Sequence, residues 1–317
     1  MAIPTRNAGP GFADTLAAVR GQRLDRELEI LVCDSGSSDA TVSLAARHGA
    51  RVIEIPSESF SHGATRNLLM ARARGNHVAL LTQDAVPAAE DWLATLLAAF
   101  ALAPDVGLAF GPYRPRPEAT VSVAREITAW FGSFSDGGPR IDVLAPGRRD
   151  APAGAFLGHL GFFTDANGCV SRAAWERVPF RPIAYAEDHL LAQDMLRAGF
   201  AKVFVPGAPV IHSHAYSSWE WLRRSFDEAR AIREIYDWSV DPRSAVRNVR
   251  GNVMADWRWT RGAQPAGAAA GRPDPGTRGL AASLRHHLAR QAGGLLGGHA
   301  ERIPPALAAR LSLEGRR

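Results

Sequence analysis

Two lone carboxylates stand just after apolar runs of the sequence. Asp84 comes two residues after the run 77–82, and Asp34 directly follows the run 27–33. Because ligands of open α/β sheets bind outside the carboxyl ends of the strands, we expect both side chains to line a ligand site. A carboxylate there can hold a divalent cation that also binds the phosphates of a nucleotide. Asp84 could equally cap a helix expected near 88–103, so its role stays open at this point.

A third apolar run leads to a basic residue. The expected strand 51–55 is followed by the segment 60–67, in which Arg66 and Asn67 lie at the start of a helix. Arginine can bind phosphate oxygens through two parallel hydrogen bonds. The sequence therefore predicts a cation and two carboxylates on one edge of a sheet.

The elements that must position these residues follow an alternating pattern. Strands are expected at 2–5, 27–33, 51–55, 77–82 and 106–111, with helices between them. This alternation predicts parallel strands joined by right-handed crossovers. The proline-containing stretch 112–161 is expected to be a long mobile loop around one helix. After it we expect helices at 171–178 and 187–198 and a strand at 202–205.

Short motifs follow one another over most of the chain. They are IPTRN at 3–7, CDSGSSD at 33–39, FSHGATRN at 60–67, TQDA at 82–85, NGCVSR at 167–172, AED at 186–188 and HSH at 212–214. In this order they resemble the family 2 glycosyltransferases, and within them the rhamnosyltransferase-like subgroup. The resemblance covers roughly residues 2 to 240. It implies a GT-A-like α/β fold with a Rossmann-like, mostly parallel central sheet flanked by helices, and a helical C-terminal appendage.

The resemblance also implies a metal site. The family's metal motif is usually Asp-x-Asp, but here Thr82 stands in place of the first carboxylate, so Asp84 must carry the cation, Mg²⁺ or Mn²⁺. The cation would bridge the phosphates of the departing nucleotide and act as a Lewis acid. His212 resembles a further ligand of the metal or the diphosphate, and His214 is the weaker candidate.

Two acidic residues resemble the catalytic carboxylates of the family. Asp188 matches the base that takes the proton of the acceptor hydroxyl, and Glu187 stands beside it as the second candidate. The same pair would also stabilise a helix start through the helix macrodipole, so a structural role stays open. Family members of this kind are similar in inverting the anomeric centre in one displacement.

The resemblance assigns a further set of residues to the nucleotide-sugar. Asp34 is expected to accept hydrogen bonds from the base or the ribose, and Arg66 to approach the diphosphate or the base pocket. The complete predicted set is Pro4, Thr5, Asn7, Asp34, Arg66, Gln83 and Asp84. The implied donor is a dTDP- or UDP-sugar that carries rhamnose or another deoxyhexose. The implied acceptor is a saccharide or a lipid-linked saccharide in cell-surface polysaccharide assembly.

Composition narrows the partners and the compartment. The chain has 37 basic and 32 acidic residues, Lys202 is its single lysine, and its sequence pI is about 9.8. Such a balance favours an anionic partner, although compositional bias of a genome would produce the same arginine excess. A nucleotide-sugar or an anionic membrane face is favoured over nucleic acid, because no aromatic-basic recognition motif is present. Two cysteines, no secretory leader and no apolar run of about 18 residues indicate a cytoplasmic protein that can still contact the membrane peripherally.

The C-terminal part is expected to be helical. We expect a donor half at 1–111, an acceptor half at 112–215, a helical extension at 216–261, a Pro/Gly/Ala linker at 262–279 and an amphipathic helical segment at 280–317. In that segment, leucines interleave with a basic face formed by Arg285, His286, His287 and Arg290. It is expected either to pack on the catalytic domain or to dock on an anionic membrane or a partner helix, and to be dispensable for nucleotide binding.

Two other functions stay open on sequence grounds. A sugar-1-phosphate nucleotidyltransferase would need a basic Gly-rich loop after its first strand, and the segment 7–11 has no basic residue. A degenerate nucleotide- or glycan-binding module would be favoured by loss of Asp84 or Asp188, and both are present.

Overall fold

The chain divides into two compact units, each formed from two stretches of sequence. The computed structural model describes residues 1–262 and 276–314. Unit 1 comprises Met1–Arg114 and Trp130–His212, and unit 2 comprises Pro115–Ala129 and Ser213–Arg317. Most of the predicted donor and acceptor halves lies in unit 1, and their separate roles stay predictions.

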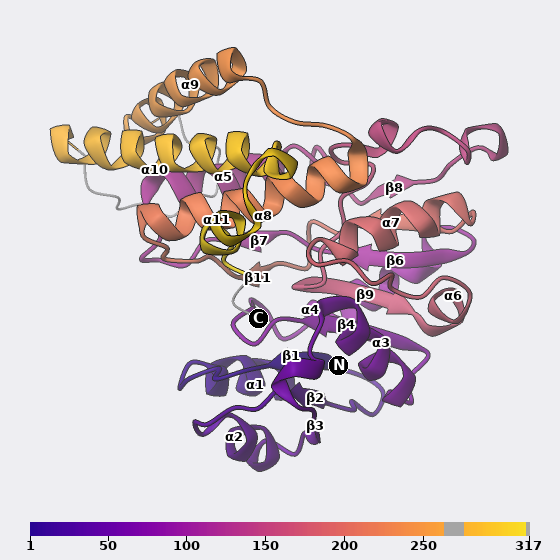
Figure 1. Ribbon diagram of the computed structural model, residues 1–317. Coiled ribbons are helices and arrows are strands. Elements are labelled where there is room, and N and C mark those ends of the chain that lie inside the picture. Colours follow the sequence, from indigo (N-terminus) through magenta and orange to yellow (C-terminus); the bar gives the residue numbers. More distant parts are fainter. Residues whose placement is uncertain (263–275, 315–317) are drawn as a thin grey trace. The chain divides into compact units, whose positions relative to one another are not determined.

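Unit 1 is built on a mostly parallel sheet, as expected (Figure 1). Its strands are, in spatial order, β3 (Arg51–Glu54), β2 (Leu31–Asp34), β1 (Ala2–Thr5), β4 (His77–Leu81), β9 (Asn167–Ser171), β6 (Val106–Phe110), β10 (Ala201–Phe204) and β8 (Arg140–Asp142). The first four are parallel to one another, whereas β9 runs antiparallel between β4 and β6 and β8 is antiparallel to β10. The strand expected at 27–33 begins only at Leu31.

Helices cover the sheet because its strands are apolar on both faces. On one face a core cluster joins alternate strand residues such as Ile3, Val32 and Leu81 with the buried side of α1 (Phe12–Arg20) and α4 (Trp92–Ala98). Successive strand residues point to opposite faces. The helices α3 (His62–Arg72) and α7 (Glu187–Arg197) also pack against the sheet strands. The remaining short helices of this part are α2 (Thr41–Arg47) and α6 (Arg172–Arg177).

Unit 1 also contains a second, small sheet, whose first strand follows β4 in the chain. It consists of β5 (Val86–Pro87), β11 (Val210–Ile211) and β7 (Tyr113–Arg114), in that order. In the antiparallel pair β5–β11, Ile211 lies opposite Val86. This register brings the residue after Ile211 next to the segment that precedes Val86.

The stretch 112–161 contains more structure than a loop around one helix. It holds β7, the helix α5 (Val121–Gly132), the strand β8 and two short 3₁₀ turns at Pro146–Arg148 and Ala153–Phe156. The expected helix is therefore present, but β8 was not predicted. Aromatic rings explain this order, because Phe134 packs on Phe110 at 5.6 Å and on Phe204 at 4.9 Å between ring centroids.

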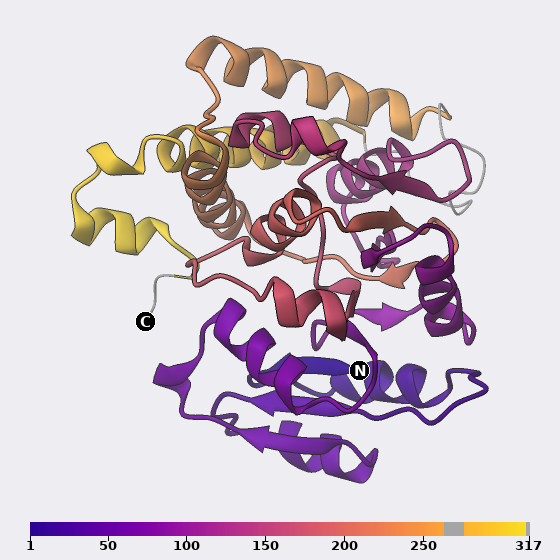
Figure 2. The ribbon, with the colours of Figure 1, turned by 90° about the vertical axis from the view of Figure 1, so that its right-hand side faces the viewer.

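Unit 2 is helical, as expected for the C-terminal appendage. It contains α8 (Ser218–Tyr236), α9 (Pro242–Thr260), α10 (Gly276–Gly297) and α11 (Pro305–Leu311). Figure 1 shows α10 between α8 and α9, and Figure 2 shows the full length of α9. Two glycines allow α10 to approach α8 closely, because a Cβ at Gly293 or Gly297 would lie 2.1 Å from the carbonyl oxygen of Leu222 or Phe226.

The predicted linker falls mostly outside the described residues. Of the linker at 262–279, residues 263–275 lie outside the described residues, and α10 already begins at Gly276. Helix α10 packs on α8 within unit 2, and the accessory role of the C-terminal segment in nucleotide binding stays a prediction. In the part of the chain that the structure describes, no helix combines the length and the apolar character needed to cross a bilayer.

Candidate active site

The loops after β1, β2 and β4 are tied together by side chains of the sequence motifs. The backbone amide of Arg6 donates to Oε1 of Gln83 at 2.9 Å, and Nε2 of Gln83 donates to the carbonyl of Arg6 at 3.3 Å. The amide of Asn7, which has a φ of +43°, donates to Oγ of Ser37 at 2.7 Å. Because strand ends at one edge of the sheet carry these loops, Gln83 and Asn7 shape the rim of the site.

Asp34 organises the loop that follows it. Its carboxylate is 1% exposed and accepts hydrogen bonds from Thr5 Oγ1 at 3.0 Å and from the amides of Gly36 at 3.1 Å and Ser37 at 2.8 Å. Pro4, the remaining predicted residue of this group, lies in β1 opposite Cys33. The structure thus gives Asp34 and Thr5 a positioning role, and direct contacts of either with a base or ribose stay predictions.

Asp84 and His212 come together, as their motif suggested. Oδ2 of Asp84 lies 3.5 Å from Nδ1 of His212, and the side chains are 37% and 9% exposed. The register of the β5–β11 pair explains this meeting, because His212 directly follows Ile211 and Asp84 lies two residues before the start of β5. The ring of Tyr113 packs edge-on against the imidazole at 4.9 Å. His214, the weaker candidate, belongs to unit 2, where it stacks on Tyr216.

This pair fits a divalent cation. A carboxylate oxygen and an imidazole nitrogen 3.5 Å apart can bind the same ion, since each metal–ligand bond is about 2.0–2.2 Å long. An imidazole ligand suits manganese better than magnesium. The remaining positions around the ion would be left for phosphate oxygens and water, which is the usual arrangement for a nucleotide-bound metal.

Arg66 lies deeper than expected. Its side chain is 2% exposed, its Nε lies 2.6 Å from Oδ2 of Asp165, and its Nη1 donates to the carbonyl of Leu81 at 3.3 Å. Gly63, in the same helix, allows the start of α3 to lie close to the chain at Arg181, because a Cβ there would lie 2.7 Å from the carbonyl oxygen of Arg181. Arg66 therefore connects the end of β4 to a buried carboxylate, and direct contact with a diphosphate stays a prediction.

Asp165 was missed by the sequence reasoning. It lies two residues before β9, and Asn167 of β9 pairs with Leu81, so Asp165 enters the sheet beside the turn that carries Asp84. The motif NGCVSR alone shows neither that a strand forms there nor in which direction it runs. In a parallel strand, Asp165 would lie at the opposite edge of the sheet, and only the antiparallel pairing brings it to the site.

Glu187 and Asp188 complete a carboxylate cluster with Asp165. Glu187 is 4% exposed, and its Oε1 lies 3.9 Å from Nδ1 of His62. The residue before it, Ala186, has a φ of +63°, a left-handed conformation that a non-glycine residue adopts at an energetic cost. Strain at the start of α7 therefore fixes where these two carboxylates point.

The charge balance of this cluster raises its pKa values. Burial, together with the charges of Asp165 and Asp188, holds the pKa of Glu187 well above its ordinary value. Burial and the charge of Asp165 raise the pKa of Asp188 from 3.8 to about 7. Arg66 opposes both shifts but does not cancel them. The cluster therefore binds and releases a proton near neutral pH, which is what general acid–base chemistry requires.

Asn167 shows that one motif is structural. Its Nδ2 donates to the carbonyls of Pro112 at 3.0 Å and Ala208 at 2.9 Å, and its Oδ1 accepts from Trp92 Nε1 at 2.9 Å. The side chain is fully buried. Asn167 thus joins the two sheets of unit 1 and holds β9 in place.

Comparison with known proteins agrees with the motifs. Residues 1–157 match the family model described as glycosyl transferase family 2. The O-antigen chain rhamnosyltransferase RfbN of Salmonella typhimurium strain LT2 is 29% identical over 231 residues, which cover 72% of this chain and 70% of that protein. The O-antigen chain rhamnosyltransferase WbaN of Salmonella anatum is 25% identical over 234 residues, with the same coverage of 72% and 70%.

Solved structures show the same fold. The mannosyltransferase PcManGT from Pyrobaculum calidifontis, in complex with GDP-Man and Mn²⁺, is similar with a TM-score of 0.60 and 18% identity, over 95% of this chain and 87% of that one. A crystal structure of S. aureus TarS in complex with UDP has a TM-score of 0.51 and 12% identity, over 95% and 90% of the two chains. The predicted GT-A-like fold is thereby confirmed. The motifs, the family model and the two curated relatives together show that this chain contains a family 2 glycosyltransferase domain, which the family model matches over residues 1–157.

Proposed function

We propose that this glycosyltransferase moves a sugar, with inversion at the anomeric carbon, from a nucleotide-sugar to a saccharide or lipid-linked acceptor. The observation that carries the proposal is Asp188, a carboxylate in a buried acidic cluster whose pKa is raised to about 7. A base with a pKa near the working pH combines a large ionised fraction with a useful affinity for the proton. The two O-antigen chain rhamnosyltransferases similar to this chain support rhamnose, or a related deoxyhexose, as the transferred sugar.

The proton movement can be followed on this chain's own residues. Ionised Asp188 accepts the proton of the acceptor hydroxyl as its oxygen attacks the anomeric carbon. The amide of His189 donates to Oδ1 of Asp188 at 2.9 Å and orients the carboxylate. Burial and the neighbouring carboxylates also hold the pKa of Glu187 well above its ordinary value, which disfavours a second negative charge beside the base. A single displacement needs no covalent nucleophile.

The departing nucleotide diphosphate is proposed to bind at the same edge of the sheet, beside Asp84 and His212. Asp84 and His212 would hold a divalent cation, which would supply positive charge for the departing diphosphate. The backbone of the loop after β1, with Pro4, Thr5 and Asn7, is proposed to contact the nucleoside. Gln83 holds this loop in place through its two hydrogen bonds to the backbone of Arg6. A dTDP- or UDP-sugar is the proposed donor, and the solved structures of similar fold contain GDP-Man or UDP.

A cytoplasmic setting is proposed for this reaction. Cys33 and Cys169 are both buried and free, which agrees with a reducing compartment.

The metal site can be tested by calorimetry. Titration of wild-type protein with UDP or dTDP in the presence of Mn²⁺ should give binding that chelation of the metal removes. Asp84→Asn should abolish the metal-dependent part of the affinity without changing the thermal melt, because its side chain is partly exposed. Asp91→Asn, an exposed carboxylate just before α4, serves as the matched control and should bind as the wild type does. Unchanged affinity of Asp84→Asn in Mn²⁺ would remove Asp84 from the metal site.

A further inference from the structure

The helix α10 is turned so that its polar side faces inward. Oγ of Ser283 donates to Oδ2 of Asp256 at 2.6 Å, and Nε2 of His287 contacts the same oxygen at 2.8 Å. His286 lies 3.4 Å from Glu126, which also pairs with Arg290. The predicted basic face is therefore divided, since His286, His287 and Arg290 face inward whereas Arg285 is exposed.

Apolar side chains occupy the outer side of α10 instead. Leu284 is 44% and Leu288 is 51% exposed. A surface helix normally buries its apolar side, and a gathered set of exposed apolar side chains marks a surface that meets another apolar phase. This inversion is the first observation that points to a docking face.

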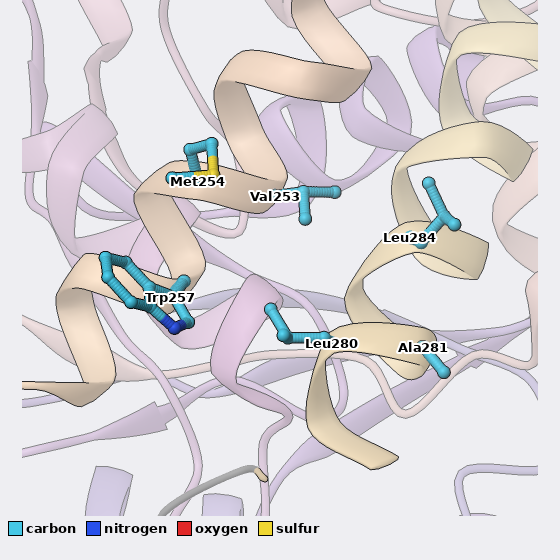
Figure 3. A pocket seen from close by; sticks show the side chains of 6 residues that line it. All are labelled: Val253, Met254, Trp257, Leu280, Ala281 and Leu284. Atoms are coloured by element: carbon cyan, nitrogen blue, oxygen red, sulfur yellow. The ribbon is translucent and has the colours of Figure 1, made fainter. Parts of the chain in front are cut away.

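The neighbouring helix α9 continues the same surface. Asn248 of α9 contacts Gln291 of α10, and Val253 lies across from Leu284 at the other end of the pair, so the helices run antiparallel. Between them lies an open apolar groove of about 470 Å³. It is lined by Val253, Met254, Trp257, Leu280, Ala281 and Leu284 (Figure 3), and Val253 and Leu280 point into the space between the helices.

Arginines form a stripe along α9 beside this groove. They are Arg243, Arg247, Arg250, Arg258 and Arg261, and all of them are exposed. Their spacing of four, three, eight and three residues repeats the period of the helix and places them on one face, with the 41%-exposed Met254 in the middle of the row. Arg261 stacks on Trp257 at 4.1 Å from the ring centroid. Asp256 is the one acidic residue in the sequences of α9 and α10, and it is buried.

We propose that this face of α9 and α10 docks on the surface of a membrane that contains anionic lipids. The docking face consists of the arginine stripe, Met254, Leu284 and Leu288. Two antiparallel helices with arginines along one side and leucines along the other match a segment that lies in the plane of the headgroups, with its apolar side chains among the acyl chains. The five arginines of the row outweigh Asp241, the exposed carboxylate at the start of α9, so this side carries a net positive charge that complements lipid phosphates. The groove between the helices gives an acyl chain a place to lie. The inference goes beyond the glycosyl transfer and does not depend on it.

Flotation with lipid vesicles tests the proposal on the full chain, without donor or acceptor. Vesicles of equal parts phosphatidylcholine and phosphatidylglycerol should carry the protein upward, and vesicles of phosphatidylcholine alone should not. Binding should fall steeply as salt is added, because the attraction acts over about one Debye length. Equal binding to both vesicle types would overturn the electrostatic part of the proposal.

Two sets of variants separate the charged and the apolar contributions. Arg247→Gln/Arg250→Gln/Arg258→Gln should lower vesicle binding by about fivefold per arginine, or roughly 100-fold together. Leu284→Ser/Leu288→Ser should lower it by about tenfold or more while keeping the salt dependence. The matched control is Arg47→Gln/Arg72→Gln/Arg310→Gln, which removes three exposed arginines on other helices and should bind nearly as the wild type does. A control that loses as much affinity as the stripe variant would show a general charge effect and contradict the docking face.

The apolar face could instead be an interface between copies of this chain. Light scattering during size-exclusion chromatography decides between the two occupants. A dimer that Leu284→Ser/Leu288→Ser dissociates, together with absence of vesicle binding by the wild type, would overturn the membrane proposal. A monomer that floats with anionic vesicles supports it.

Discussion

The molecule contains two buried clusters of carboxylates with opposite charge balance. In unit 1, Asp165, Glu187 and Asp188 share Arg66 as their buried basic partner, and their surroundings raise the pKa values of Glu187 and Asp188. In unit 2, Glu126 and Asp256 lie among Arg125, Arg290, His286 and His287. The two clusters thus differ in how many cations accompany each carboxylate.

That difference decides what each cluster can do. Burial alone would raise the pKa of Glu126, but the charge of Arg290 and contacts with His286 lower it to about 2. Burial opposes the shift of Asp256 as well, yet hydrogen bonds from His287, Ser122 and Ser283 hold its pKa far below the ordinary value. A cluster with enough cations stays ionised and holds helices together, whereas a cluster short of cations holds a proton near neutrality.

The largest effect is expected when the proton site of unit 1 is removed. Asp188→Asn should lower the transfer rate by about 10²–10⁴-fold, the contribution of a positioned base, with donor affinity nearly unchanged. Glu187→Gln should lower the rate less, since Glu187 is not the residue proposed to take the acceptor proton. Transfer rates at saturating donor measure both. A rate near that of the wild type for Asp188→Asn would move the base elsewhere, with Glu187 as the first residue to examine.

Removal of a charge from unit 2 should affect stability instead. Asp256→Asn leaves Arg125 and His287 without their buried counter-charge, and breaking such a pair costs about 3–5 kcal/mol. Denaturant titration measures the loss, and calorimetry with UDP and Mn²⁺ should show nucleotide affinity unchanged under conditions where the variant is folded. Equal stability of variant and wild type would contradict the structural role of the cluster.

The two clusters should also respond to pH in opposite directions. The folded pKa of Asp188 is raised, so its contribution to stability is complete below its unfolded value of 3.8 and is lost as pH rises toward about 7. The folded pKa of Glu126 is lowered, so its contribution is complete above 4.5 and is lost as pH falls toward about 2. Each effect should be about 1–4 kcal/mol. Unfolding curves of Asp188→Asn and Glu126→Gln against wild type, measured across both windows, check the signs, and a shared direction would refute the comparison.

The smallest effect concerns strain next to the unit 1 cluster. Ala186 adopts a left-handed conformation that glycine adopts freely, so Ala186→Gly should raise the free energy of unfolding by about 1 kcal/mol. Asp105→Gly, at an exposed position with a φ of +51°, is the matched control. Both variants should gain stability, but only Ala186→Gly should change the transfer rate, because only Ala186 precedes the proposed catalytic carboxylates. Thermal melts and rates measure the two quantities.

Sequence reasoning predicted the parts of the site that depend on strand ends. Asp84 and His212 lie together because apolar runs stop just before them, and runs of this kind are visible in sequence. Asp165 could not be found in the same way, because its position depends on the direction of β9, and a short apolar run does not show whether it pairs parallel or antiparallel. The deep burial of Arg66 follows from that same pairing.

The C-terminal helix illustrates a second limit. Its periodicity correctly indicated two faces, one of leucines and one of polar residues. Periodicity does not state which face is inward, and here Asp256 and Glu126, both distant in sequence, attract the polar face. The strand expected at 27–33 was too long for a related reason, since the residues 27–30 alternate charged and apolar side chains as a strand would, but form no ladder.

A surface helix usually tolerates substitution of its polar side chains better than of its apolar ones. We expect the reverse in α10, because its polar side chains face inward. A library selected only for folding in water should accept polar residues at Leu284 and Leu288 and reject most changes at Ser283 and His287. Variants of higher solubility can therefore begin at the two leucines, where a lysine would remove an exposed apolar side chain without leaving a cavity in the core. Consensus rules that replace buried polar residues by apolar ones would do harm at this helix.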